Sequence, residues 1–285
     1  MLPIVLVHGI ARFDILLEIE RKKIGLPDGA FDGTQYFRNI KTQLESSGFG
    51  PVFHTNEDFA GPVELRAAQL KGTVEDVLTS TGESAVHIIA HSMGGLDARH
   101  MIVDLNMADK VSSLTTIGTP HSGTPLATHV IENGGRFWID ILKNVIDLEG
   151  FADLMVSRCE LFNHRAEDSE ARNGVLYQTY SSSEQLDRIF LPLVPSFVFL
   201  SRTGENDGLV PVNSQQWTTE LSSANGIRKQ IRQRRFPFPA DHLNEIGWWD
   251  PNEAINPLVA GSFDEQRAAY ENKVKDVYLQ IARDL

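Results

Sequence analysis

Val86-His-Ile-Ile-Ala-His-Ser-Met-Gly-Gly-Leu-Asp-Ala-Arg-His-Met-Ile102 is the stretch that organises this chain. Its first five residues are typical of a buried strand, and the run from Leu96 onward is compatible with a helix. Ser92 lies in the turn between them, with small residues, Ala90 and Gly94, two positions to either side. A serine at such a junction is held in a strained backbone conformation at the edge of a sheet, where its hydroxyl can act as a nucleophile.

Other apolar runs place this junction within an alternating pattern of strands and helices. Strands are predicted at Ile4 to Val7, Pro51 to His54, Val86 to Ala90, Val111 to Ile117 and Gly174 to Ser181. Amphipathic helices are predicted at Tyr36 to Ser47, Glu64 to Leu78, Leu96 to Leu105 and Phe263 to Leu285. This alternation predicts the α/β class, with a central, mostly parallel sheet flanked by helices and with residues 1–285 forming a single domain.

Composition excludes some classes of protein. The formal net charge of −12 disfavours a nucleic-acid partner, and the basic run Arg228 to Arg235 is interpreted as a solvated strand or turn face. Cys159 is the only cysteine, so no disulfide can form within the chain. No apolar run is long enough for a membrane span. We expect a soluble monomer, either cytoplasmic or secreted with its leader absent from this sequence.

A nucleophilic serine needs a base and an acid, and their order along the chain narrows the candidates. Of the nine histidines, only His242 follows every good acid candidate. The acids that compete are Asp187, Asp207 and Asp241. Asp241 is adjacent to His242, and neighbouring side chains in a turn rarely face each other. Asp207 lies in an Asn-Asp-Gly turn, which presents a side chain well, so Ser92, Asp207 and His242 are the predicted triad. The alternative for Asp207 is a turn with a solvated carboxylate.

The same chemistry needs two backbone N–H groups to hold an oxyanion. Met93 follows the nucleophile and supplies one of them, and Ile10, after His8-Gly9 at the end of the first strand, is predicted to supply the other.

The strand–helix alternation breaks between residues 126 and 165. Two apolar helices are predicted there, around Phe137 to Leu148 and Phe151 to Phe162. The first carries a stripe that could cover a substrate pocket as a lid, formed by Phe137, Trp138, Ile141, Leu142 and Val145. Packing of this stripe on the core is an equally acceptable interpretation.

Four motifs in this order resemble bacterial triacylglycerol lipases of the Pseudomonas and Burkholderia group. They are His8-Gly-Ile10, Ala90-His-Ser-Met-Gly-Gly95, Gly204-Glu-Asn-Asp-Gly-Leu-Val210 and Asp241-His-Leu-Asn-Glu245. The alanine at the start of the second motif and the Ile and Met oxyanion pair resemble the small Bacillus lipases. The resemblance implies an α/β-hydrolase fold, a helical lid, esterase and lipase activity, and the triad named above.

The resemblance also has two departures. The larger group binds a structural calcium partly through an aspartate two residues after its catalytic histidine, where this chain has Asn244. Asp187 stands where that group has its other carboxylate ligand. Loss of one carboxylate weakens a site for a hard cation, so a calcium at Asp187 and Asn244 is only a tentative expectation. That group also has a disulfide, which the single Cys159 rules out, so secretion is not carried over.

Together these features predict a serine carboxylic-ester hydrolase, most simply a lipase that cleaves acylglycerol esters through an acyl-enzyme intermediate. No cofactor is expected for the chemistry. The expected partners are a lipid or ester substrate and, through the lid, a lipid–water interface. Two alternatives stay open: a short-chain carboxylesterase or transacylase, and a catalytically silent lipid-binding protein of the same fold.

Overall fold

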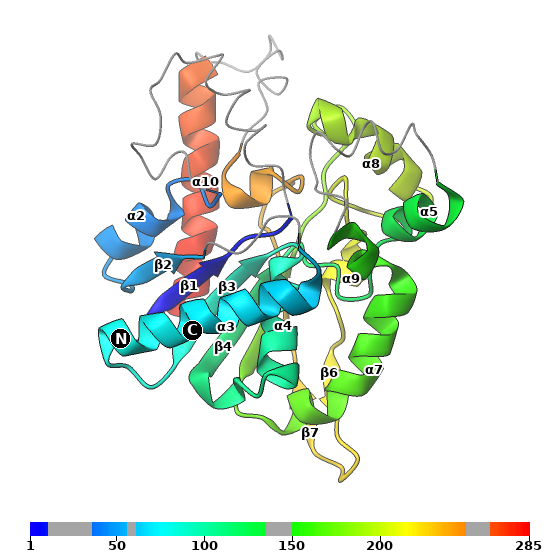
Figure 1. The fold of residues 1–285 in the computed structure, drawn as a ribbon. Helices are drawn as coiled ribbons and strands as arrows, with labels where there is room; N and C mark the ends of the chain where they lie inside the picture. The colour runs from blue at the N-terminus through cyan, green and yellow to red at the C-terminus, as the bar shows by residue number, and fades with distance from the viewer. Residues whose placement is uncertain (11–35, 56–60, 135–149, 249–262) are drawn as a thin grey trace.

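A parallel β-sheet forms the centre of the protein (Figure 1). The computed structural model describes residues 1–10, 36–55, 61–134, 150–248 and 263–285. Within these ranges the six-stranded sheet has the order β2-β1-β3-β4-β5-β8, and every neighbouring pair is parallel. Its strands are β1 (Ile4–Val7), β2 (Val52–His54), β3 (Val86–His91), β4 (Val111–Ile117), β5 (Leu176–Ser181) and β8 (Arg232–Arg235).

Helices cover both faces of this sheet, because alternate residues of its inner strands point to opposite sides. Val5 and Val7 of β1 pack in the same core as helices α3 (Val63–Thr81) and α4 (Gly94–Asp104). Ile4 and Leu6 pack in the core that contains α2 (Ile40–Ser46) and α10 (Phe263–Arg283). The predicted α/β fold with a mostly parallel sheet is therefore confirmed.

The remaining elements lie along the flank of the sheet and near the carboxyl ends of its strands. The helices are α5 (Pro125–Asn133), α7 (Val156–Arg172), α8 (Val194–Leu200) and α9 (Val212–Gln215). Strands β6 (Glu220–Ser222) and β7 (Arg228–Gln230) form a separate antiparallel pair. Short 3-10 helices span Ala108–Lys110, Gly150–Leu154, Leu191–Leu193 and Asn244–Ile246, the last of which is η5.

Two segments show what pairing and packing add to local composition. The basic run expected to be a solvated strand or turn face forms two strands with mostly exposed side chains, β7 and β8, and β8 also joins the main sheet beside β5. Helix α8 forms within a stretch whose Leu- and Pro-rich composition by itself favours a loop. In both cases pairing and packing with distant segments outweigh local composition.

The predicted insertion between residues 126 and 165 is only partly described. Its second helix begins close to where it was predicted, after a 3-10 turn, but α7 continues to Arg172 and lies along α4. Arg99 of α4 and Glu170 of α7 form a fully buried ion pair that joins the two helices. Residues 137–148, which include the predicted lid stripe, lie outside the described residues, so the lid stays a prediction.

Two further features concern the length and hydropathy of the helices and the environment of the single thiol. No helix among the described residues is both long enough and apolar enough to cross a membrane. Cys159 lies in α7, buried, and burial raises the pKa of its thiol to about 12.

Candidate active site

Ser92 occupies the sharp turn between β3 and α4, and its backbone has the strained conformation that the motif predicts. Its φ is 56°, in the left-handed region that non-glycine residues rarely adopt. The turn is crowded by the end of β1: a Cβ at Gly94 would lie 2.6 Å from the carbonyl oxygen of His8. A Cβ at Gly9 would lie 2.7 Å from the Cβ of Ser92. Only glycine at these two positions allows the loop after β1 to approach the nucleophile so closely.

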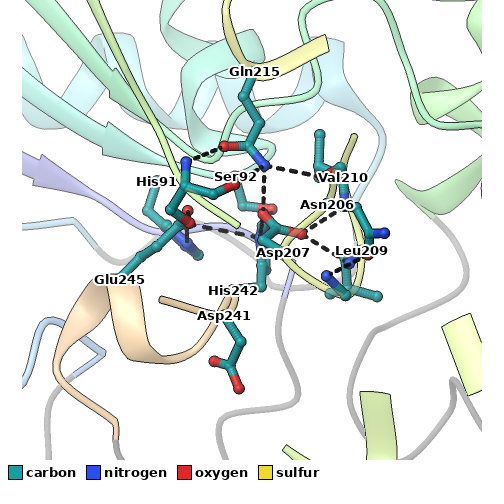
Figure 2. A network of polar contacts seen from close by, with 12 residues as sticks. His91, Ser92, Asn206, Asp207, Leu209, Val210, Gln215, Asp241, His242 and Glu245 are labelled. Carbon is teal, nitrogen blue, oxygen red and sulfur yellow. Dashed lines mark hydrogen bonds and ion pairs between the residues drawn. The ribbon is translucent and has the colours of Figure 1, made fainter. Parts of the chain in front are cut away.

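The three predicted triad residues come together at the carboxyl edge of the sheet (Figure 2). His242 Nε2 lies 2.8 Å from Ser92 Oγ, and His242 Nδ1 lies 2.8 Å from Asp207 Oδ2. With the carboxylate accepting the Nδ1–H, Nε2 is left to accept the serine proton. The arrangement can therefore deprotonate Ser92 as it attacks an electrophile, which is the chemistry of nucleophilic catalysis.

The Asp207 carboxylate is fully buried and surrounded by donors, so it is not the solvated turn residue of the alternative interpretation. Its Oδ1 accepts the backbone N–H groups of Leu209 and Val210, at 2.8 and 2.7 Å. Its Oδ2 faces the amide nitrogen of Gln215 at 3.1 Å as well as His242. No local sequence pattern marks Gln215, because its contact with Asp207 depends on the placement of α9.

Asp241, the competing acid, faces away from His242 into its own turn. Its Oδ1 accepts the N–H groups of Leu243 and Asn244, and its Oδ2 accepts that of Phe190. Burial raises the pKa of Asp241 to about 7, and these hydrogen bonds oppose the rise. The other competitor, Asp187, is exposed.

The residues predicted to hold an oxyanion lie on both sides of Ser92. Met93 follows it directly at the start of α4, and Ile10 lies three residues after β1 and borders the same pocket as Ser92. Arg66 anchors this loop: its Nη2 donates to the carbonyl of His8 at 2.8 Å and also to Asp97 Oδ2 at 2.7 Å. Arg66 is fully buried, so the loop is held from inside the protein.

A pocket with mainly apolar walls opens beside the serine hydroxyl. Ser92 and His242 lie at one end, and the remaining lining residues are Ile10, Tyr36, Thr124, Phe151, Leu154, Leu209, Val210 and Leu243. These mainly apolar walls favour a nonpolar group beside the serine, because burial of apolar surface is favourable.

A second polar network, which the sequence did not reveal, lies behind the triad (Figure 2). His91 Nδ1 is 2.7 Å from the Tyr36 hydroxyl, and His91 Nε2 is 2.9 Å from Glu245 Oε2. Glu245 Oε1 is 2.5 Å from Ser182 Oγ, while its Oε2 is 3.8 Å from His242 Nδ1. Burial and the nearby Asp207 raise the pKa of Glu245 well above its ordinary value, and burial lowers that of His91.

The side chains around Asn244 offer little to the tentative calcium. Asn244 is buried, its amide nitrogen donates to Trp248 O, and its oxygen already accepts the N–H of Asp241. A hard cation gains affinity from ligand charge, and here the one carboxylate of the tentative pair, Asp187, is exposed. Calcium therefore stays a prediction, and no chemical step depends on it.

Comparison with known proteins gives related lipases. A family model described as a PGAP1-like alpha/beta domain matches residues 72–145. The chain is 29% identical over 229 residues to triacylglycerol lipase 2 of Saccharomyces cerevisiae, which covers 75% of this chain and 63% of that protein. It is 34% identical over 132 residues to the triacylglycerol lipase of Burkholderia plantarii, with 45% of this chain and 32% of that protein covered.

Solved structures agree in fold. The mature form of the Bacillus licheniformis lipase BlEst2 superposes with a TM-score of 0.59 at 18% identity, covering 85% of this chain and 84% of that one. The likeness to bacterial triacylglycerol lipases is thus confirmed, although the chain spans less than two thirds of the length of either curated relative above. With the parallel sheet and the serine turn, these similarities show that the chain has the α/β-hydrolase fold.

Proposed function

We propose that this protein is a serine carboxylic-ester hydrolase that acts, as a monomer, on lipid esters of the acylglycerol class. The observation that carries the proposal is the unbroken chain of hydrogen bonds from Ser92 through His242 to Asp207, ending beside an apolar pocket. Similarity to proteins named triacylglycerol lipase supports the substrate class. A helical lid formed by residues 126–165 is part of the same proposal and rests on the sequence stripe alone.

In the proposed mechanism Ser92 Oγ attacks the ester carbonyl while His242 Nε2 takes its proton. Asp207 holds the Nδ1–H of His242 and stabilises the imidazolium that forms. The N–H groups of Ile10 and Met93 hold the oxyanion of the tetrahedral intermediate. His242 then protonates the leaving alcohol, and water, activated by the same histidine, hydrolyses the acyl-enzyme.

The pocket makes a prediction about acyl length that distinguishes lipases from short-chain esterases. On p-nitrophenyl esters from acetate to palmitate, we expect kcat/KM to rise with chain length while the added carbons still enter the pocket. Each buried methylene contributes about 0.8 kcal/mol, or roughly fourfold in kcat/KM. Triglyceride emulsions should be cleaved as well. A maximum at acetate, with no release of fatty acid from emulsions, would favour the short-chain esterase instead. Labelling of Ser92 by a fluorophosphonate tests the nucleophile separately.

Removal of divalent cations should have little effect. Because Asn244 is held by Asp241 and Trp248, we expect EDTA to leave the melting temperature and the esterase rate unchanged. Thermal unfolding and ester hydrolysis measured with EDTA, and then with excess calcium, check this. A lower melting temperature that calcium alone restores would instead establish the tentative site.

A further inference from the structure

Glu245 lies where the carboxyl ends of three neighbouring strands meet. Its carboxyl contacts His91 at the end of β3 and Ser182 just beyond β5. At the end of β4 it takes the space of a missing side chain, since a Cβ at Gly118 would lie 2.1 Å from Glu245 Oε2. Glu245 itself belongs to η5, three residues after His242, and it is fully buried. The fold therefore encloses this carboxyl from every side next to the triad.

The number of protons available to Ser182 determines the state of this carboxyl. Ser182 Oγ has one proton and two neighbours, the carbonyl oxygen of Ala240 at 2.8 Å and Glu245 Oε1 at 2.5 Å. A carbonyl oxygen can only accept, so the serine proton belongs to the contact with Ala240. The contact between Ser182 and Glu245 then needs a proton from Glu245, which must be a carboxylic acid.

The rest of the network is satisfied by the same assignment. The Gly9 N–H bonds the Tyr36 hydroxyl oxygen, and the Tyr36 O–H donates to His91 Nδ1. His91 Nε2–H then donates to Glu245 Oε2. Each hydrogen bond in the row has one donor and one acceptor when His91 and Glu245 are both neutral. This row of hydrogen bonds begins at Gly9, in the loop after β1 that is predicted to hold the oxyanion and is called the oxyanion loop below. It ends at Ala240, two residues before His242.

We propose that Glu245 is a positioning residue: a neutral carboxylic acid that links the oxyanion loop at Gly9 to the segment carrying His242, and not a second negative charge for that histidine. This inference rests on the proposed ester hydrolysis, because the two segments it joins are those that act in that reaction. The charge that stabilises the imidazolium then comes from Asp207 alone, although Glu245 Oε2 lies only 3.8 Å from His242 Nδ1.

The groups around Glu245 favour this neutral form. Burial raises the pKa of Glu245, the acidic groups Asp207 and Asp241 raise it further, and the contact with Ser182 opposes the rise. The nearby imidazoles belong to His91 and His242, and the phenols of Tyr36 and Tyr278 are also close. The Arg66 guanidinium lies near the Tyr36 phenol, and it is already bonded to Asp97.

Comparison of Glu245→Gln with Glu245→Leu tests the inference. A glutamine keeps one donor for Ser182 and one acceptor for His91, so we expect E245Q to fold and to retain kcat/KM within about threefold. The acidic limb of its pH profile should not move, because no charge beside His242 has been removed. E245L breaks the row, and we expect kcat to fall about tenfold or more with KM nearly unchanged, as the oxyanion loop loses its support.

Infrared spectroscopy provides a readout that does not depend on activity. The difference spectrum between wild type and E245Q at pH 7 should contain the carbonyl stretch of a protonated carboxylic acid. The matched control is Glu170→Gln, since the Glu170 carboxylate accepts two N–H groups from Arg99 at 2.8 and 2.9 Å and should give only carboxylate bands.

Three results would overturn the inference: carboxylate bands lost in E245Q, a shift of its acidic limb to lower pH, or failure of E245Q to fold. If E245L does not fold, the pH profile and kcat/KM of E245Q, together with the infrared difference spectrum, test the inference without it. A wild-type protein that hydrolyses no ester refutes the proposed function instead, and the infrared comparison then decides the state of Glu245 by itself.

Discussion

Replacement of Ser92 by alanine should lower kcat/KM for ester hydrolysis by about 10⁴-fold or more, because the attacking oxygen is removed. The variant should keep its fold, since alanine tolerates the space and only one hydrogen bond, to His242, is lost. Labelling by a fluorophosphonate should disappear as well. Hydrolysis of a p-nitrophenyl ester and the circular dichroism spectrum of the variant give the measurement.

Ser196→Ala is the matched control for this change. Ser196 is also fully buried, and its hydroxyl donates to the carbonyl oxygen of Leu193, away from the triad. We expect S196A to cost some stability and to leave kcat nearly unchanged. Activity of S92A within about tenfold of wild type would mean that Ser92 is not the nucleophile.

Asp207→Asn should reduce kcat by about 10³- to 10⁴-fold at neutral pH, as the wrong tautomer of the base is then held. The structure explains which way the amide must face. Two backbone N–H groups, from Leu209 and Val210, point at the Oδ1 position, so the amide oxygen takes that place. The NH₂ group of the introduced asparagine then faces His242 Nδ1. In the wild type the Nδ1–H donates to the carboxylate there, but an NH₂ group cannot accept that hydrogen bond. His242 would have to carry its proton on Nε2 and could no longer accept one from Ser92.

Asp241→Asn is the control that separates the two candidate acids. Both carboxyls are fully buried and adjoin His242 in space or in sequence, but Asp241 bonds only backbone N–H groups of its own surroundings. We expect D241N to lower the melting temperature and to retain most of kcat. Equal losses of kcat in D207N and D241N would contradict the assignment of Asp207 as the acid.

Local patterns were sufficient for the central strands and for proposing the triad residues. The buried runs at β1, β3 and β4 read as strands because both faces of a central parallel strand are apolar. Ser92 could be recognised because its turn depends on its immediate neighbours. His242 followed from chain order, and Asp207 from the turn chemistry of its own segment.

The supporting residues could not be found in this way, because their partners are distant in sequence. Glu245 meets His91 across 154 positions and Ser182 across 63, and Gln215 reaches Asp207 only through the placement of α9. Each is an ordinary polar residue in its local context. The place of β8 in the main sheet was not predictable for the same reason: its arginine-rich sequence indicates a solvated strand or turn, and its pairing with β5 depends on distant residues.

The single buried thiol makes this chain convenient for attaching probes. Cys159 is 3% exposed, and its pKa of about 12 leaves almost no reactive thiolate at neutral pH. A maleimide should therefore react slowly with the native protein. One cysteine introduced on the exposed surface, at Val198 of α8 for example, would then carry a fluorophore at a known position without removal of any native residue.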